Sequence, residues 1–447
     1  METRQGGTRV LMLPWLAHGH ISPFLELAKR LTEKNFHIYF CSTNVNLNSV
    51  KKMLPEKYSH SIQLVELHLP SSPELPPCYH TTNGLPSHLM GTLKIAFGNS
   101  KPFFSHILSS LNPDLVMYDF NMPWVSTASS SLNIPSIIFF SFGCLFTSFA
   151  LNLLENPDTE FPFQSIHLRE FEKRNFQAMF EFSAGGVKDR DLVIESIMLS
   201  RDVILIKTSR ELEGKYIDYL STLVKKKIQP VGPLVQEIVD RDEDIEVMQF
   251  LEKKDESSVV FVSFGTEFFL SNEDREEIAY GLELSKVNFI WVLRFPVGEK
   301  TSVEEALPEG FLDRVGDLGM VVEGWAPQAK ILMHSSTGGF VSHCGWNSVL
   351  ESIKFGVPII AMPMHLDQPL NARLVEEVGV GMEVKRDDNG KLDRKEIARV
   401  ITRIVVEKNG KKVRNKAREV SEKITVKEVD EIDEMVEVVL QLCGKRK

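Results

Sequence analysis

The chain has 447 residues, of which 43% are hydrophobic and 25% are charged, and its formal net charge is -10. This length predicts about two or three globular domains with ample hydrophobic core. The acidic balance argues against a nucleic-acid-binding protein, because such proteins need concentrated Lys and Arg to displace counterions.

The five cysteines lie far apart without Cys-x-x-Cys spacing, so we expect neither a disulfide framework nor a zinc site. The amino terminus lacks the long apolar run of a signal peptide. Residues 121–154 contain no charged side chain, but Pro135, Gly143 and several serines and threonines interrupt the apolar pattern. We therefore expect a buried strand and helix there instead of a membrane span, and a cytoplasmic protein.

In the first half of the chain, short apolar runs alternate with segments of helical periodicity. The predicted strands are 8–13, 36–41, 62–67, 114–118, 136–140 and 203–207, and the predicted helices are 22–33, 85–111, 125–132 and 211–227. Residues 157–190 are irregular, aromatic and mixed in charge. We interpret them as a variable insertion that helps to form a pocket.

The alternation begins again after an acidic stretch that is poor in core residues, which we assign to an interdomain linker at 239–247. The predicted strands are 259–263, 289–293, 320–323, 339–342 and 358–362, with helices beginning near Asn272, Pro327, Trp346 and Asn371 and a tail, 394–442, that is helical throughout. The pattern indicates an α/β fold with two doubly wound, Rossmann-like domains, each a parallel sheet covered on both faces.

We place these domains at 1–238 and 248–425, and we expect residues 426–447 to form a helix that packs back on the first domain. Two such domains facing one another would enclose a cleft. Ligands of doubly wound sheets bind beyond the carboxyl ends of the strands.

Two titratable side chains are predicted at one edge of the first sheet. The first βα connection, residues 14–20, is not the Gly-x-Gly-x-x-Gly of a dinucleotide-binding fold, so hydride chemistry loses its best support. It ends at His20, a residue type suited to act as a general base near neutral pH. Asp119 ends the strand at 114–118, and its carboxylate could fix the tautomer of the imidazole. The structural alternative is an ordinary loop histidine and a strand-end aspartate.

Three patterns admit a metal site. His18 and His20, two residues apart, could ligate zinc in a hydrolase, but no ordered series of further ligands follows them. The Asp-Arg-Asp triplets at 189–191 and 240–242 match the motif of metal-dependent sugar transferases. Both triplets lie in hydrophilic segments without a preceding apolar strand, so we interpret them as solvated charges.

The stretch 325–368 surrounds two short apolar strands with polar side chains. After the strand at 339–342, His343 to Gly345 form a tight turn and Trp346 opens a helix. The free amides at a helix amino terminus bind anions, so a diphosphate fits here without a cation. The side chains that add donors are His343, Asn347 and Ser348.

Other residues of this stretch match the remaining parts of a nucleotide sugar. Trp325 offers a flat face to a base, and Glu351 can accept hydrogen bonds from two ribose hydroxyls. Asp367 and Gln368 follow the strand at 358–362 and could bond the hydroxyls of a sugar. We therefore interpret 325–368 as a nucleotide-sugar site.

At this point a family resemblance can be stated. The segments WAPQ, HCGWNSVLES, GVPIIAMP and DQ resemble the signature box of plant family 1 UDP-dependent glycosyltransferases, which have the GT-B fold, and the likeness covers essentially the whole chain. The resemblance implies that Trp325 stacks on uracil, that the backbone of Ala326 bonds the uracil edge, and that Gln328 and Glu351 hold the ribose. It places Thr266, His343, Gly345, Asn347 and Ser348 at the phosphates and Trp346, Asp367 and Gln368 at the sugar.

His20 and Asp119 match the catalytic base and the supporting carboxylate of this family. The implied reaction is an in-line displacement in which UDP leaves and a β-glycoside forms with inverted configuration. It needs neither a cofactor nor a metal. Gln368 resembles members that use UDP-glucose, although UDP-xylose remains open.

The acceptor is implied by weaker matches. NFHIYFCSTNVNL, ELHLPSSPELPP, HTTNGLP and SFGTEFFLS are similar to branch-forming members, which extend a sugar on a terpenoid, flavonoid or carotenoid-derived glycoside. We expect a monomeric hexosyltransferase with an amphipathic glycoside acceptor. Transfer to an aglycone, a metal-dependent hydrolase using His18 and His20, and a sugar-nucleotide-binding protein without catalysis remain the alternatives.

Overall fold

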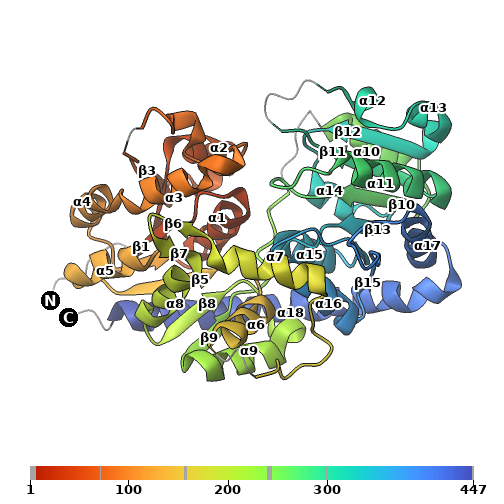
Figure 1. Cartoon of the computed structure of the whole chain (residues 1–447). Coiled ribbons are helices and arrows are strands. Elements are labelled where there is room, and N and C mark those ends of the chain that lie inside the picture. Colours follow the sequence, from red (N-terminus) through yellow and green to blue (C-terminus); the bar gives the residue numbers. More distant parts are fainter. Residues whose placement is uncertain (1–6, 71, 156–158, 239–243, 297–300, 445–447) are drawn as a thin grey trace. The chain divides into compact units, whose positions relative to one another are not determined.

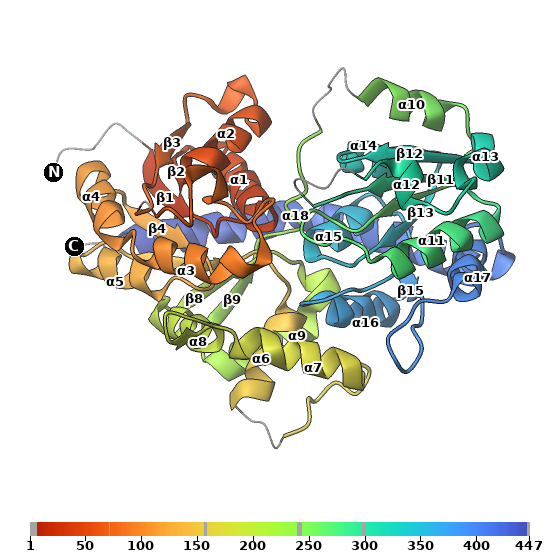
Figure 2. The same ribbon diagram turned by 45° about the horizontal axis from the view of Figure 1, so that its top comes forward.

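The computed structural model describes residues 7–70, 72–155, 159–238, 244–296 and 301–444. The chain divides into two compact units. The first comprises Met1–Leu151, Gln177–Gln236 and Lys427–Lys447, and the second comprises Asn152–Phe176 and Glu237–Val426. Each unit has its own parallel sheet with helices on both sides, as Figures 1 and 2 show.

The first unit contains a seven-stranded sheet in which every pair of neighbours is parallel. Its strands, in spatial order, are β3 (Ile62–Glu66), β2 (Phe36–Ser42), β1 (Thr8–Leu13), β4 (Leu115–Tyr118), β5 (Ser136–Phe140), β8 (Val203–Ile206) and β9 (Lys227–Pro230). The order reverses between β1 and β4, which makes this the position where a doubly wound sheet binds ligands.

The helices of the first half follow the strands in chain order. They are α1 (His18–Thr32), α2 (Asn44–Met53), α3 (Met90–Gly98), α4 (Lys101–Leu111), α5 (Pro123–Ser131), α6 (Cys144–Glu155), α7 (Glu170–Glu181), α8 (Asp189–Leu199) and α9 (Arg210–Val224). A small antiparallel hairpin, β6 (Ser183–Ala184) with β7 (Val187–Lys188), precedes α8.

The second unit contains a six-stranded parallel sheet. Its strands, in spatial order, are β12 (Gly319–Glu323), β11 (Asn288–Leu293), β10 (Val259–Ser263), β13 (Thr337–Ser342), β14 (Ile359–Ala361) and β15 (Gly381–Glu383). The helices of the second half of the chain are α10 (Ile245–Glu252), α11 (Asn272–Ser285), α12 (Val303–Ala306), α13 (Phe311–Val315), α14 (Gln328–Met333), α15 (Trp346–Lys354), α16 (Gln368–Val378), α17 (Arg394–Val405) and α18 (Lys411–Gly444), of which α18 continues from the second unit into the first. Here the order reverses between β10 and β13.

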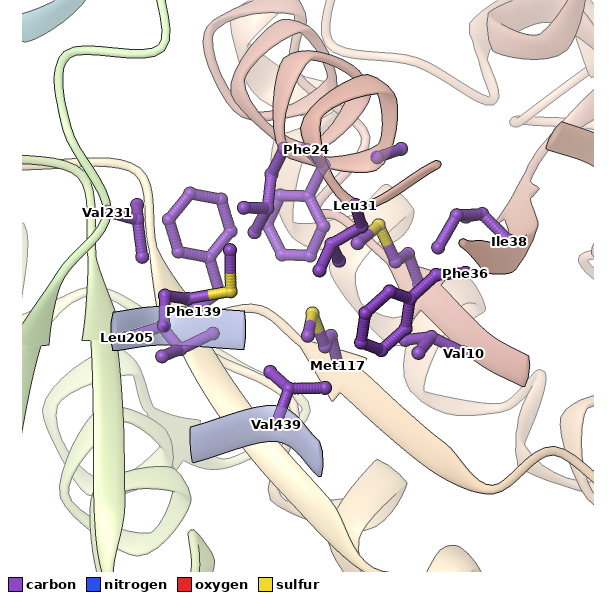
Figure 3. Close-up of a cluster of buried hydrophobic side chains, with 14 of the residues drawn as sticks. Val10, Phe24, Leu31, Phe36, Ile38, Met117, Phe139, Leu205, Val231 and Val439 are labelled. Atoms are coloured by element: carbon purple, nitrogen blue, oxygen red, sulfur yellow. The ribbon is translucent and has the colours of Figure 1, made fainter. Parts of the chain in front are cut away.

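The core of the first unit explains why its strands read as continuous apolar runs. Strands β4, β5 and β8 are buried along their whole length, because helices cover both faces of the sheet. Figure 3 shows Val439, from the carboxyl-terminal part of α18, among Val10, Phe24 and Met117 of this core. The last part of the chain therefore belongs to the hydrophobic core of the first unit.

Several helical or irregular predictions differ from the structure. The predicted helix 85–111 is divided into α3 and α4, which are separated by Asn99 and Ser100. The predicted helix 211–227 ends at Val224, because Lys225 adopts a left-handed conformation (φ 54°) and β9 follows. β9 contains Pro230, which has no backbone N–H to donate. An edge strand tolerates it, because one side of such a strand makes no ladder hydrogen bonds. The tail is broken at 406–410, where Gly410 lies so close to the carbonyl oxygen of Arg403 that a Cβ atom would be 2.1 Å from it.

The insertion at 157–190 also differs from its prediction. It contains α7 and the β6–β7 hairpin, and its first part, through Phe176, groups with the second unit. The triplet predicted at 240–242 lies outside the described part of the chain, as do residues 239–243 of the predicted linker 239–247. Within the described ranges, no helix is long and apolar enough to cross a bilayer.

The packing of α18 generates a stability prediction. Met435 is fully buried in the core of the first unit, so Met435→Ala should lower the free energy of unfolding by about 2–5 kcal/mol, since it removes apolar contacts and leaves a cavity. Urea denaturation measures this loss. Val429→Ala on the same helix, at a side chain that is 62% exposed, is the matched control and should leave the midpoint almost unchanged. Equal effects of the two substitutions would contradict the assignment of Met435 to the core.

Candidate active site

The first candidate group lies at the switch point of the first sheet. His20 is in the first turn of α1, which follows β1 after the connection 14–17, and not at the end of a loop as the sequence suggested. Asp119 is the first residue after β4, and β4 pairs with β1 so that Tyr118 lies beside Leu13. Nδ1 of His20 is 2.8 Å from Oδ2 of Asp119. The structure therefore brings the two predicted residues into hydrogen-bond contact.

Asp119 is itself held in place. Its side chain is fully buried, Oδ2 accepts a hydrogen bond from the backbone amide of Trp15 at 3.0 Å, and Oδ1 accepts one from the amide of Phe120 at 2.8 Å. Amide donors stabilise a carboxylate, and a carboxylate beside Nδ1 favours the imidazole tautomer with a proton on Nδ1. Nε2 is then the nitrogen that can take a proton from a ligand.

Ser141 is a residue of this site that the sequence reasoning missed. It follows β5, the neighbour of β4, and its hydroxyl oxygen lies 2.9 Å from Nδ1 of His20. Thus residues after three adjacent strands meet at one imidazole nitrogen. The useful signal was positional, because Ser141 ends an apolar strand as Asp119 does, but serine is too common a residue to stand out.

Aromatic rings surround the histidine. The ring of Phe120 lies 5.2 Å from the His20 ring and the ring of Phe142 lies 6.4 Å from it, measured between centroids. Phe142 also contacts Phe146 of α6, at 5.3 Å. Phe120, Phe142 and Phe146 are half-buried, so the imidazole stands beside partly accessible apolar surface.

The second candidate group lies at the switch point of the other sheet. His343 directly follows β13, and the glycine of the β10 connection, Gly265, approaches it closely. A Cβ atom on Gly265 would be 2.6 Å from Nε2 of His343, and one on Gly345 would be 2.5 Å from the same atom. Both positions therefore require glycine if the imidazole is to keep its place. Thr266, the next predicted residue, follows Gly265 on this connection.

His343 is a buried, neutral imidazole. Only 9% of its surface is exposed, and Nδ1 has no hydrogen-bond partner among the described residues. Burial lowers the pKa of His343 to about 3, with a smaller lowering from His365, while a backbone hydrogen bond at Ser263 opposes the shift. A buried polar atom without a partner costs free energy, so the geometry suits a ligand that would bond Nδ1.

Helix α15 begins beside this histidine. Its N-cap residue, Gly345, has no side chain to satisfy the first amides, and Trp346, Asn347 and Ser348 form the first turn. Unsatisfied amides and the helix dipole make this end attractive to an anion. Trp346 and Ser348 are buried, whereas Asn347 is half-buried.

One turn further on, a polar pair joins α14 to α15. Nε2 of Gln328 donates to Oε2 of Glu351 at 2.7 Å and to Oγ of Ser348 at 3.3 Å. Trp325 lies on the connection between β12 and α14 and is 48% exposed, so its ring can receive a ligand. Ala326, beside it, is buried.

The connection after β14 carries the last predicted pair. Oε1 of Gln368 accepts hydrogen bonds from the amides of Met364 and His365, each at 3.0 Å, which leaves its amide nitrogen as the end that can serve a ligand. Asn371, which the sequence reasoning missed, donates to Oδ2 of Asp367 at 2.8 Å and to the carbonyl of Cys344 at 3.0 Å. Asp367 is thereby oriented and tied to the His343–Gly345 turn.

The metal patterns are not supported by the geometry. Among the residues that the structure describes, no group of three or more His, Cys, Asp or Glu side chains is arranged to hold a metal ion. Asp189 pairs with Lys94, and Asp191 pairs with Arg190 on the surface. Arg190 and Asp191 are thus solvated as expected, whereas the side chain of Asp189 is only 18% exposed and differs from that expectation.

The α/β chain thus has a histidine–carboxylate contact in one unit and a buried histidine beside the amino terminus of a helix in the other. A sequence profile described as "UDP-glucoronosyl and UDP-glucosyl transferase" matches residues 169–443, and one described as "Glycosyltransferase, N-terminal domain" matches residues 7–236. The chain belongs to the family of UDP-dependent glycosyltransferases. The predicted family, the GT-B fold and the enzyme class are thereby confirmed.

Relatives and solved structures agree. The chain is 54% identical to the beta-D-glucosyl crocetin beta-1,6-glucosyltransferase of Gardenia jasminoides over 96% of this chain and 98% of that protein. It is also 54% identical to a mogroside IIIx synthase of Siraitia grosvenorii, over 98% of this chain and 94% of that one. A structure of UGT2 from Phytolacca americana, complexed with UDP-2fluoro-glucose and pterostilbene, superposes with a TM-score of 0.78 at 27% identity and covers 98% of this chain and 100% of its own.

The buried His343 generates a pH prediction. Its pKa is lowered to about 3 in the folded state, against about 6.5 in an unfolded chain, so the unfolded state binds more protons between these values. The contribution of His343 to stability is therefore complete above pH 6.5 and is lost as the pH falls toward 3. Thermal unfolding at pH 7 and pH 5 should show a smaller acid-induced loss in His343→Gln than in the wild type. Parallel pH profiles of the two proteins would contradict a neutral His343.

Proposed function

We propose that this glycosyltransferase transfers glucose from UDP-glucose, with inversion, to a sugar hydroxyl of a plant secondary-metabolite glycoside. The observation that carries the catalytic part of the proposal is the contact of 2.8 Å between His20 and Asp119. It supplies a base whose Nδ1 is held by a carboxylate, which directs proton uptake to Nε2 and stabilises the conjugate acid.

The proposed reaction is a single displacement. Nε2 of His20 takes the proton of the acceptor hydroxyl, whose oxygen forms a bond to the anomeric carbon as the bond from that carbon to UDP breaks. UDP departs with the bonding electrons. The imidazolium is stabilised through Nδ1 by Asp119, which remains ionised. Attack opposite the leaving group converts the α-linked donor into a β-glycoside.

The second unit would bind the donor. Trp325 stacks on uracil with the backbone of Ala326 at the uracil edge, and Gln328 and Glu351 bond the ribose. The diphosphate occupies the amino terminus of α15, with the buried, neutral His343 at the phosphates. Thr266, Gly345, Asn347 and Ser348 complete the phosphate site, and Trp346, Asp367 and Gln368 contact the sugar. Such fixed donors stabilise the charge that develops on departing UDP.

The glycoside acceptor is supported from two directions. The names of the relatives from Gardenia jasminoides and Siraitia grosvenorii refer to a glucosylated crocetin and to a mogroside. The half-buried rings of Phe120, Phe142 and Phe146 near His20 offer apolar surface that suits an amphipathic acceptor. Turnover of a matched pair of acceptors, such as a flavonoid and its monoglucoside, distinguishes the two alternatives. Transfer to a glycoside predicts faster turnover of the monoglucoside, and direct transfer to an aglycone predicts faster turnover of the flavonoid.

Substitution of the base gives a direct prediction. His20→Ala should lower kcat by about 10²- to 10⁴-fold, because proton removal from the acceptor loses its catalyst. Calorimetry should find nearly unchanged UDP affinity, since the predicted UDP-contacting residues all lie between Thr266 and Gln368. Asp119→Asn should also lower kcat while leaving UDP binding intact. Equal loss of turnover and UDP binding in His20→Ala would contradict the base role.

We also propose that transfer needs no metal ion. The helix terminus and neutral donors can balance the diphosphate, so turnover in excess chelator should equal turnover without it. Loss of activity in chelator that Mg²⁺ or Zn²⁺ restores would instead favour metal-dependent chemistry. The five cysteines, all within the described residues, form no disulfide with one another, which is compatible with a reducing compartment such as the cytoplasm.

A further inference from the structure

Residues 159–176, from the first half of the chain, pack against the donor-binding unit. Ile166, Leu168 and Phe176 are buried, and Phe171 covers Gly390, where a Cβ atom would lie 3.3 Å from the phenyl ring. The segment ends in the first turns of α7, and Figure 2 shows the start of α7 beside α16. It is therefore part of the structural surroundings of α16, although 190 or more residues separate them in sequence.

Charged side chains tie this segment to α16 and β15. Nη2 of Arg373 donates to both carboxylate oxygens of Glu172 at 3.0 Å, and Nη1 bonds Glu383. Arg169 donates to both oxygens of Glu383, at 2.8 and 3.1 Å, and to Glu172 at 3.3 Å. Two arginines and two glutamates thus form a closed ring of contacts, which we call the four-residue ion network.

The network is buried and internally neutral. The side chains of Glu172, Glu383 and Arg373 are 4%, 1% and 5% exposed, and only Arg169 reaches solvent, at 26%. Its two positive and two negative charges balance. A buried network of this kind is sensitive to the loss of one member, because the partner left behind remains a desolvated charge.

The same helix carries the predicted sugar contacts. Gln368 is the first residue of α16, Asp367 is its N-cap, and Arg373 follows about one and a half turns further on. Asn371, between them, holds Asp367 and the carbonyl of Cys344. Nearer the other end of α16, the hydroxyl of Ser165 donates to Oε1 of Glu377 at 2.6 Å. The segment therefore contacts α16 at two positions, Arg373 and Glu377, both beyond the end of the helix that carries the predicted sugar contacts.

We propose that Glu172, Arg373, Glu383 and Arg169 are positioning residues for the donor sugar, acting through α16 on Asp367 and Gln368. This inference rests on the proposed function of the second unit. The first part of the insertion, which the sequence analysis assigned to a variable pocket, then serves the donor side of the reaction. Asp367 and Gln368 can bond the sugar only where α16 holds them, and a helix anchored by a neutral buried network keeps them in place.

The test separates the sugar from the rest of the donor. In Glu172→Gln the bidentate acceptor of Arg373 becomes an amide that presents one oxygen and one donor, while Arg373 keeps Glu383. We expect KM for UDP-glucose to rise about threefold to tenfold. UDP affinity by calorimetry, KM for the acceptor and kcat should stay within about twofold of the wild type, because UDP lacks the sugar that α16 contacts.

Glu170→Gln is the matched control. It removes the same charge two residues away on α7, at a side chain that is 87% exposed and pairs with Lys173. Its kinetic constants should equal those of the wild type. If Glu172→Gln fails to fold, Ser165→Ala replaces it, because it breaks the surface contact to Glu377 and leaves the network intact; it should raise KM for UDP-glucose in the same selective way.

The outcomes are distinguishable. A selective rise in KM for UDP-glucose supports the inference. An equal loss of UDP and UDP-glucose affinity, a change in acceptor KM alone, or no kinetic change in a folded variant overturns it. Absence of transfer by the wild-type enzyme would instead count against the proposed function.

Discussion

The strand order of two parallel sheets is the constraint on which both functional sites depend. In each sheet the order reverses beside the first strand, so the connections after two neighbouring strands diverge and leave room at their carboxyl ends. In the first unit this brings His20, after β1, to Asp119, after β4. In the second it brings the Gly265–Thr266 connection, after β10, to His343, after β13. Neither pair is close in sequence, and each exists only because the strands lie side by side.

Burial then sets the chemistry of each histidine. His20 is partly accessible and shares Nδ1 with a buried carboxylate and a hydroxyl, an arrangement that stabilises a proton acquired during reaction. His343 is enclosed between two glycines and has a pKa lowered to about 3, so it can contribute a dipole but no charge. In the proposed mechanism, histidine thus serves as a proton acceptor in one sheet and as a neutral ligand group in the other. The difference arises from a carboxylate neighbour in one case and from desolvation in the other.

Much of this organisation could be predicted from the sequence, because buried parallel strands are short apolar runs and their ends mark the ligand-binding edge. That reasoning selected His20 with Asp119 and the polar residues of 325–368, and the family resemblance gave their roles. It missed features that depend on tertiary contact alone. Ser141 is a serine, a residue type too common to indicate a site. β9 contains Pro230, and proline ordinarily argues against a strand.

The four-residue ion network was equally invisible in the sequence. Glu172 and Arg373 are 201 positions apart, and each stands in a segment where a charged residue would ordinarily face solvent. The insertion was therefore interpreted from its irregular composition as pocket-forming. Only the fold shows that its first part joins the unit that carries the nucleotide-sugar signature.

The central claim is that a base beside the acceptor drives a single displacement at the anomeric carbon of a UDP-sugar. Proton NMR of the product formed from UDP-glucose and a monoglucosylated flavonoid or triterpenoid tests it most directly. The account predicts one new glucose with β configuration, attached to a hydroxyl of the existing sugar. A product with α configuration, or free glucose released by hydrolysis as the main product, would contradict it.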